Sequence, residues 1–351
     1  MALSIRPSPR VQPERRDFIS YFDSLLARLA LCSLCSRDER DYIDEVIPDF
    51  EVIDVVAHGG YGRVYRCLEP VSYNVVAVKQ ITILGSFQGV PAQIIREVAF
   101  LKELRHNNIV KLLNVYVRGD RYVNLVFEHL QCDLHDYIRK SRYSNSRIVK
   151  TFMHQILSAL EFCHTRKVLH RDLKPSNVLV DEPNLRIKLA DFGLAREFRD
   201  DISYTEQVGT AWYRAPEVLF DNYQYSSPID LWGAGCVFAE MLTGGPLFHT
   251  SRKRDELQSI FRLLGTPTED TWPGITQSLP DIHKYKKYNP VGMDELFPNL
   301  EQSGQNLLAR LLCMNPNDRI SAAAALSHAY FRDAQWDGKP KEQSSSCIPF
   351  R

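Results

Sequence analysis

The sequence has no excess of charge of either sign. Its 351 residues include 43 lysines and arginines against 43 aspartates and glutamates, so the formal net charge at pH 7 is zero. A protein that binds mainly nucleic acid needs a basic surplus to neutralise the phosphate backbone. The charge balance therefore predicts that nucleic acid is not a partner of this chain.

Long hydrophobic runs are also absent. No stretch reaches about 18 uncharged apolar residues, the length that suggests a membrane-crossing helix, so we expect no membrane partner. The most apolar early segment, residues 25–34, contains Arg28 and lacks the basic start and cleavage site of a signal peptide. Four residues follow Cys347, one too many for a prenylation box, so no lipid anchor is predicted.

The eight cysteines form no disulfide framework. Scattered cysteines in a long chain favour reduced thiols, and therefore a location in the nucleus, the cytoplasm or both. Cys32 and Cys35 form a C-x-x-C pair, but no second ligand pair lies near them. No zinc site is predicted.

The chain divides into an extension, two lobes and a tail. Residues 1–46 begin with a proline- and arginine-rich stretch expected to be disordered, and then show helical spacing of apolar residues over residues 17–33. This helix would pack on its own domain or dock a partner. Alternation typical of strands begins at residue 50 and continues to about 130, and helical periodicity dominates residues 131–332. Residues 333–351 form a C-terminal tail. The pattern predicts an α+β chain.

Two motifs in the helical part carry the chemistry. Residues 170–177 read HRDLKPSN, and Asp191-Phe-Gly follows fourteen residues after Asn177. Together they supply a carboxylate, a lysine and two oxygen ligands suited to magnesium. In this spacing they resemble the catalytic and metal loops of the eukaryotic protein kinases. The resemblance covers about residues 50–332 and implies the two-lobed fold of that family, with a small β-rich N-lobe and a larger α-helical C-lobe.

The resemblance implies a role for each of these residues. Asp172 would position the substrate hydroxyl and take up its proton, and Lys174 would steady the γ-phosphate, as in serine/threonine kinases. Thr210 belongs to the same catalytic set. Asn177 and Asp191 would bind Mg²⁺, so ATP and Mg²⁺ are the expected cofactors.

The nucleotide site is expected to begin at a glycine loop. Residues 57–64 read AHGGYGRV and keep two of the three glycines of the kinase loop, with Ala57 in place of the first. The added methyl group should weaken nucleotide binding without abolishing it. Tyr61 would be an inhibitory phosphorylation site or simply a cap on the loop.

The other ATP contacts also follow from the resemblance. Lys79 and Glu97 would form the ion pair that holds the lysine on the phosphates. Residues 125–130 would form the hinge, the segment whose backbone bonds the adenine base. These six residues alone do not distinguish an adenine site from the end of a buried strand. The full expected set is Val56, Ala57, His58, Gly59, Gly60, Tyr61, Gly62, Arg63, Val64, Lys79, Glu97, Phe127, Glu128, Leu130 and Asp133.

Residues 191–217 resemble the activation segment of the cyclin-dependent kinases. Thr205 stands where an activating kinase phosphorylates such enzymes, and the arginines expected to receive the phosphate are Arg96, Arg171 and Arg196. Gln207 departs from the Thr-x-Tyr pattern of MAP kinases, which excludes that group. A helix predicted over residues 91–104 resembles the cyclin-binding helix. Because Ile94 is in register with the buried face, its neighbour Ile95 should point elsewhere, toward a cyclin subunit.

The segment that follows Thr205 predicts the substrate. In proline-directed kinases, the residue matching Gly209 is left-handed and turns its carbonyl away from the substrate, so the next substrate residue lacks an acceptor for its N–H. Proline has no N–H to leave unpaired. Val208, Gly209 and Arg214 would form the pocket for this proline, and the expected substrates are proteins with Ser/Thr-Pro sites.

Three further features bear on this apparatus. Glu217 would pair with Arg319 in a salt bridge, and Asp230 would hold the catalytic loop from a buried helix. The third feature, Gly233, lies in that helix and should weaken it by about 0.5–1 kcal/mol. The sequence predicts a cyclin-dependent, proline-directed serine/threonine kinase acting in the cell cycle or in transcription. The alternatives are a related kinase active without a cyclin and a nucleotide-binding pseudokinase scaffold.

Overall fold

The computed structural model describes residues 50–59, 62–83, 90–118, 122–140, 146–198, 209–220, 225–250 and 253–332, without the side chains of residues 58, 59, 253 and 254. The N-terminal extension, the C-terminal tail, Gly60, Tyr61, Thr205 and Val208 lie outside the described residues. Contacts divide the chain into two units. The smaller unit holds the described residues up to Ile95 together with Leu112–His129, and the larger holds Arg96–Lys111 and the described residues from Leu130 onward.

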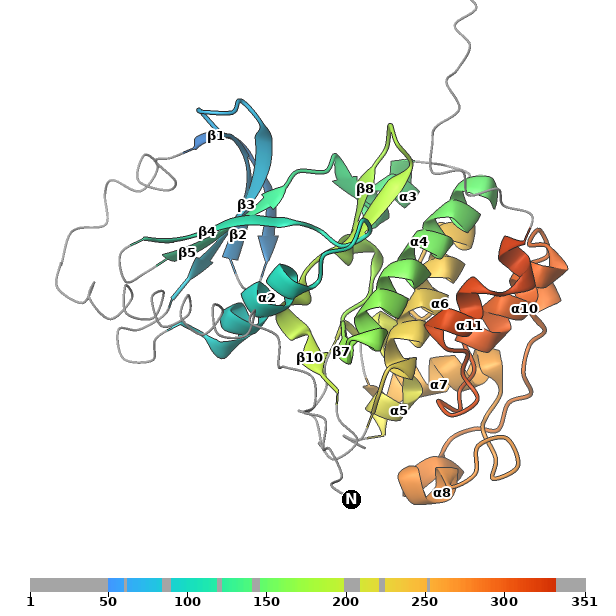
Figure 1. Ribbon diagram of the computed structural model, residues 1–351. Helices are drawn as coiled ribbons and strands as arrows, with labels where there is room; N and C mark the ends of the chain where they lie inside the picture. The colour runs from blue at the N-terminus through green and yellow to red at the C-terminus, as the bar shows by residue number, and fades with distance from the viewer. Residues whose placement is uncertain are drawn as a thin grey trace, which may run out of the picture. The chain divides into compact units, whose positions relative to one another are not determined.

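The smaller unit is built on an antiparallel sheet of five strands in the order β1-β2-β3-β5-β4 (Figure 1). Their bounds are β1 Glu51–Gly59, β2 Gly62–Leu68, β3 Val75–Thr82, β4 Leu112–Arg118 and β5 Tyr122–Glu128. Alternate residues of β3 are buried, as the period of two predicts for a strand. β1 and β4 are the edges of the sheet, so the chain enters this unit directly at an edge strand.

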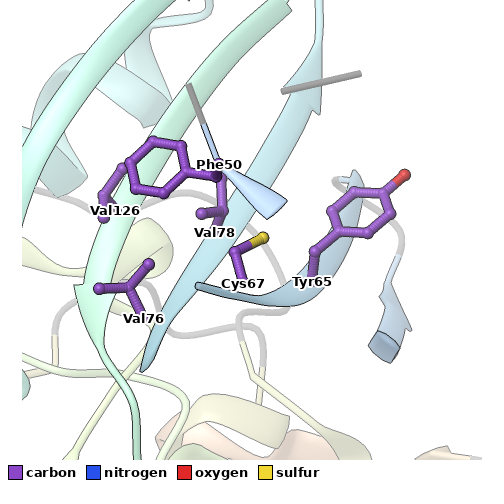
Figure 2. Close-up of a cluster of buried hydrophobic side chains, with 6 residues drawn as sticks. All are labelled: Phe50, Tyr65, Cys67, Val76, Val78 and Val126. Atoms are coloured by element: carbon purple, nitrogen blue, oxygen red, sulfur yellow. The ribbon is translucent and has the colours of Figure 1, made fainter. Parts of the chain in front are cut away.

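One face of this sheet carries an apolar cluster, here called the Phe50 cluster. Figure 2 shows Phe50 against Val78 and Val126. The members are 0–7% exposed, and Tyr116 packs against them. They come from β2, β3, β5 and the residue before β1: Phe50, Tyr65, Cys67, Val76, Val78 and Val126. Through this cluster, the first described residue packs against the middle strands of the sheet.

Helix α2, Ala92–Glu103, begins directly after Pro91, whose carbonyl accepts the backbone N–H of Ile94 at 2.9 Å. Ile94, Val98 and Leu101 are buried at 5% exposure or less, which confirms the predicted register. Ile95 is only half-buried, as expected for a side chain on another face.

The prediction of one continuous small lobe over residues 50–130 differs from the observed division, because residues 96–111 group with the larger unit. Backbone hydrogen bonds explain the difference. Val110 donates to the carbonyl of Leu189 at 2.9 Å, and Leu189 donates to the carbonyl of Asn108 at 2.8 Å. The side chain of Asn108 also donates to Gln155 of the larger unit at 2.7 Å.

The larger unit is mainly helical. Its helices are α3 Leu134–Lys140, α4 Ser146–Thr165, α5 Pro216–Leu219, α6 Pro228–Thr243, α7 Lys253–Leu264, α8 Ile275–Ser278, α9 Met293–Leu296, α10 Gln302–Leu311 and α11 Ala322–Leu326, with short 3-10 turns at Pro175–Asn177, Phe192–Leu194, Ala211–Tyr213, Pro280–Lys284 and Ala329–Phe331. Helices α4 and α6 agree with the helical periodicity predicted for residues 131–332. α6 is apolar on nearly all sides and buried over Ile229–Met241, so it forms the centre of this unit (Figure 1).

Two small sheets complete the larger unit. One contains β6 Cys132–Asp133, β8 Val178–Asp181 and β9 Arg186–Leu189, and the other pairs β7 Val168–Leu169 with β10 Arg196–Glu197. These strands bracket the 170–177 loop and Asp191. A β-sheet unit and a helical unit together confirm the α+β class. Within the described residues, no helix is long and apolar enough to span a bilayer, and the five described cysteines are all free.

Candidate active site

Asp172 lies at the centre of a hydrogen-bond network within the larger unit. One carboxylate oxygen, Oδ2, accepts from Lys174 Nζ at 2.8 Å and from Asn177 Nδ2 at 3.0 Å. The other, Oδ1, accepts from both the backbone N–H and the hydroxyl of Thr210 at 2.9 Å. Lys174 also donates to the Thr210 hydroxyl at 2.7 Å. The structure therefore brings together the predicted base, the predicted phosphate-facing lysine and Thr210.

Asp230 holds the backbone of this loop in place from helix α6. Its carboxylate accepts the backbone N–H groups of His170 at 2.9 Å and Arg171 at 2.8 Å, and it contacts the ring of His164 at 2.9 Å. Burial alone would raise the pKa of the Asp230 carboxyl, but the His164 contact and the backbone donor lower it below its usual range. An ionised acceptor on a buried helix thus fixes the loop, as predicted.

His170 links the catalytic loop to the segment that carries Asp191. The N–H of Asp172 donates to His170 Nδ1 at 3.3 Å, so Nε2 is the atom that carries a hydrogen and bonds the carbonyl of Ala190 at 3.0 Å. The His170 ring also meets the buried Phe192 edge-on, with 4.9 Å between ring centroids. The ring thereby bridges the two motifs that the sequence separates.

The predicted magnesium ligands meet the chemical requirements of a hard cation. Asn177 donates through Nδ2 to the carbonyl of Asp172 at 2.8 Å and to its carboxylate, which leaves the amide oxygen as the ligand atom. Asp191 adopts a left-handed backbone with φ of 61° and adds a carboxylate. One amide oxygen and one carboxylate suit Mg²⁺, which binds few protein ligands and keeps the rest for water and phosphate. Among the described residues, no cluster of three or more His, Cys, Asp or Glu side chains offers another metal site.

The backbone beside the catalytic loop is turned by Gly209. Its φ of 86° lies in the left-handed region, as predicted. A Cβ atom at this position would stand 2.7 Å from the carbonyl oxygen of Arg171, so no other residue fits without displacement. Arg214 donates to the Gly209 carbonyl at 2.8 Å. A small hollow beside this turn is lined by Asp172, Gly209, Thr210, Tyr213 and Arg214, among others.

Three arginines of the larger unit lie close enough to repel one another. Burial, together with Arg196 and Arg171, lowers the pKa of the Arg96 guanidinium. Its Nε is buried and has no hydrogen-bond partner among the described residues. Burial also lowers the pKa of Arg171, and Arg196 adds to this effect. An anion placed among these cations would relieve the repulsion.

Two supporting contacts were not anticipated from the sequence. Arg171 donates to the hydroxyl of Tyr225 at 2.9 Å and to the carbonyl of Leu194 at 2.6 Å. No sequence motif indicates the role of Tyr225, because its partner lies 54 residues away along the chain.

Gly233 has a packing role that helix propensity does not predict. A Cβ there would lie 3.1 Å from Cβ of Leu173, so the glycine allows α6 to approach the catalytic loop.

Those residues of the predicted ATP set that the structure describes in the smaller unit lie on its strands. Ala57 of β1 pairs with Val64 of β2, and Lys79 of β3 lies between Val64 and Leu125. Gly62 has a φ of 141° and opens β2 where a Cβ would meet the carbonyl of Gln80. Phe127 and Glu128 end β5.

Other members of the predicted ATP set belong to the larger unit. Glu97 is 2% exposed on α2, and Leu130 and Asp133 follow the boundary between the units. Lys79 belongs to the smaller unit and Glu97 to the larger, so their ion pair stays a prediction. The roles assigned toward ATP also stay predictions.

A comparison with protein families gives one finding. The family model described as "Protein kinase domain" matches residues 50–331, which is most of the chain.

Proposed function

Because the chain belongs to the protein kinase family, we propose that it is a cyclin-dependent serine/threonine kinase that phosphorylates Ser/Thr-Pro sites. Protein kinases are transferases that take the γ-phosphate from ATP, typically with Mg²⁺. The proposed cyclin dependence and the proposed preference for Ser/Thr-Pro sites depend on residues of the larger unit.

The observation that carries the proposal is the turn at Gly209. Its carbonyl accepts a hydrogen bond from Arg214 at 2.8 Å, and its left-handed backbone sets the direction of that carbonyl. A substrate residue with a backbone N–H beside this turn would lose an acceptor, at a cost of about 1–3 kcal/mol. Proline avoids this cost. The geometry favours substrates in which proline follows the phosphorylated residue.

The catalytic network supports transfer to an aliphatic hydroxyl. Asp172 is held by Thr210 on one oxygen and by Lys174 and Asn177 on the other, so its orientation is set before substrate arrives. Bound ATP with Mg²⁺ would supply the phosphoryl group and neutralise its developing charge. The chain's own residues orient the attacking hydroxyl through Asp172, accept its proton there, and place the positive charge of Lys174 beside it. An intact network of this kind favours a catalyst over a pseudokinase scaffold.

The arginine cluster supports activation by phosphorylation of Thr205. Arg96, Arg171 and Arg196 form a cationic site, and the buried Nε of Arg96 has no hydrogen-bond partner in the part of the chain that the structure describes. A phosphothreonine carries about −1.5 to −2 charges and bonds guanidinium groups strongly. Arg96 follows Ile95 on α2, the side chain proposed to meet the cyclin. Cyclin binding and phosphorylation would thus act on adjacent residues of one helix.

Thr205→Ala should lower transfer to a Ser-Pro peptide by at least about tenfold when the chain is co-expressed with a cyclin and an activating kinase. The reason is the loss of the anion that neutralises the arginines, and tenfold corresponds to about 1.4 kcal/mol. Initial rates of γ-phosphate transfer measure the effect, and Ser203→Ala is the control for removing a hydroxyl nearby.

A second variant tests the mechanism of this loss. Arg96→Met should lower activity in the wild-type chain but add little to Thr205→Ala, because both changes remove the same interaction. Independent effects that multiply would contradict a shared site. Full activity of Thr205→Ala would contradict phosphorylation-dependent activation altogether.

A further inference from the structure

Exposed large apolar side chains gather in one part of the smaller unit. Seven of the nine found among the described residues lie between residues 52 and 75, and they are Val52, Ile53, Val55, Val56, Val71, Tyr73 and Val75. Val56 is a member of the predicted ATP-binding set, so its exposure has another explanation. Val52 and Val55 on edge strand β1 are 43% and 46% exposed. Single exposed valines are ordinary, but a local concentration on a sheet edge indicates a contact surface.

The strand register shows that these two valines extend the Phe50 cluster. Val55 pairs with Tyr65, which pairs with Val78, which pairs with Val126. In the next row, Val52 pairs with Cys67, and Cys67 pairs with Val76. Cross-strand partners share a face of the sheet, and the register shift between Val52 and Asp54 places Val52 and Val55 on the same face although they are three residues apart. Each row therefore runs from a buried centre to an exposed valine. Val52 and Val55 are here called the β1 rim.

The rim is adjacent to the point where the preceding chain arrives. Phe50 is itself a member of the cluster and is 7% exposed (Figure 2). Forty-nine residues precede it, and residues 17–33 have the apolar spacing of an amphipathic helix, with Phe18, Phe22, Leu25, Leu26 and Leu29 on one face.

The lengths of these segments are compatible with docking within one chain. A helix of this size is about 25 Å long, and nine-residue β1 is about 30 Å long. Residues 34–49 could join them over up to about 55 Å when extended, and a tether this short keeps the effective concentration high.

We propose that residues 17–33 form an amphipathic helix that docks on the β1 rim of the same molecule, so that the Phe50 cluster continues into the N-terminal extension. The apolar face of the helix would cover Val52 and Val55. Residues 17–33 suit this site for three reasons. One face of the predicted helix is apolar, the chain that follows it leads into the Phe50 cluster, and the linker is long enough for the helix to lie anywhere along β1.

Hydrogen exchange of the full-length chain, followed by mass spectrometry, tests the proposal. Amides of residues 18–29 should exchange at least about tenfold more slowly than in an unstructured peptide. The double variant Val52→Asp and Val55→Asp, which changes the β1 rim, should remove this protection. Phe22→Asp, which changes the apolar face of the predicted helix, should remove it as well.

Matched controls separate docking from general damage. Leu113→Asp changes a leucine of similar exposure, 45%, on the opposite edge strand β4, and should leave protection unchanged. Ser20→Asp changes the polar face of the predicted helix, with the same expectation. Exchange within β5 reports whether each variant remains folded, since both rim valines are nearly half exposed.

Three outcomes would overturn the proposal. The first is a lack of protection in the wild-type chain, and the second is protection that survives the rim variant. The third is protection that appears only at high protein concentration or only when a cyclin is added, because the helix would then dock on a second copy or on a partner.

Discussion

Asp172→Asn should lower the turnover number for phosphate transfer by about 10²–10⁴-fold, the range for loss of a general base. An asparagine amide nitrogen in place of Oδ2 would face the donors of Lys174 and Asn177, which now bond the carboxylate at 2.8 Å and 3.0 Å. It could neither accept the proton of the substrate hydroxyl nor hold Lys174. Initial rates with labelled ATP measure the loss.

ATP binding should be largely unchanged in this variant, and a fluorescent nucleotide titration checks that expectation. The control is Asp270→Asn at an exposed position. Normal turnover in Asp172→Asn would show that the proton is taken up elsewhere and would remove Asp172 from its assigned role.

Arg319→Met should destabilise the larger unit by about 3–5 kcal/mol, because the variant leaves a buried carboxylate without its partner. Arg319 donates to both oxygens of Glu217, at 2.6 Å and 3.0 Å, with side-chain exposures of 0% and 9% for the pair. It also bonds the carbonyls of Cys313, Pro228 and Met314. Urea unfolding followed by circular dichroism measures the change.

Lys150→Met is the matched control for this experiment. It breaks the Lys150–Glu301 pair at 2.8 Å, in which the glutamate is 52% exposed, so a cost of only about 0–1 kcal/mol is expected. If the two variants were equally stable, the buried pair would not be the main link between α5 and the segment after α10.

Local patterns predicted the helices and the catalytic loop well. α4 and α6 follow from apolar spacing, and the supports from Asp230 and Arg319 follow from motifs with known partners. Hydrogen bonds from His170 and Arg171 to Asp230, and from Arg319 to Glu217, confirmed these two supports. The left-handed turn at Gly209 was also predictable, because glycine enters that conformation at little cost.

Contacts between distant segments were less predictable. Nothing near Tyr225 indicates that its hydroxyl accepts from Arg171, and nothing in residues 96–111 indicates that they pack with β9 of the larger unit. Helix propensity alone predicts only that Gly233 weakens α6. Its close approach to Leu173 depends on how α6 packs against the loop, which a one-dimensional pattern does not contain.

The most direct test of the proposed function compares γ-phosphate transfer to a Ser-Pro peptide and to its Ser-Ala twin, using the purified chain with co-expressed cyclins and without them. A cyclin-dependent, proline-directed kinase should transfer phosphate only with a cyclin and should favour Ser-Pro by at least about fivefold, because an unpaired N–H costs about 1 kcal/mol or more. Equal rates on the two peptides would contradict proline direction. Bound ATP with no transfer under any condition would contradict the assignment of a catalytic kinase.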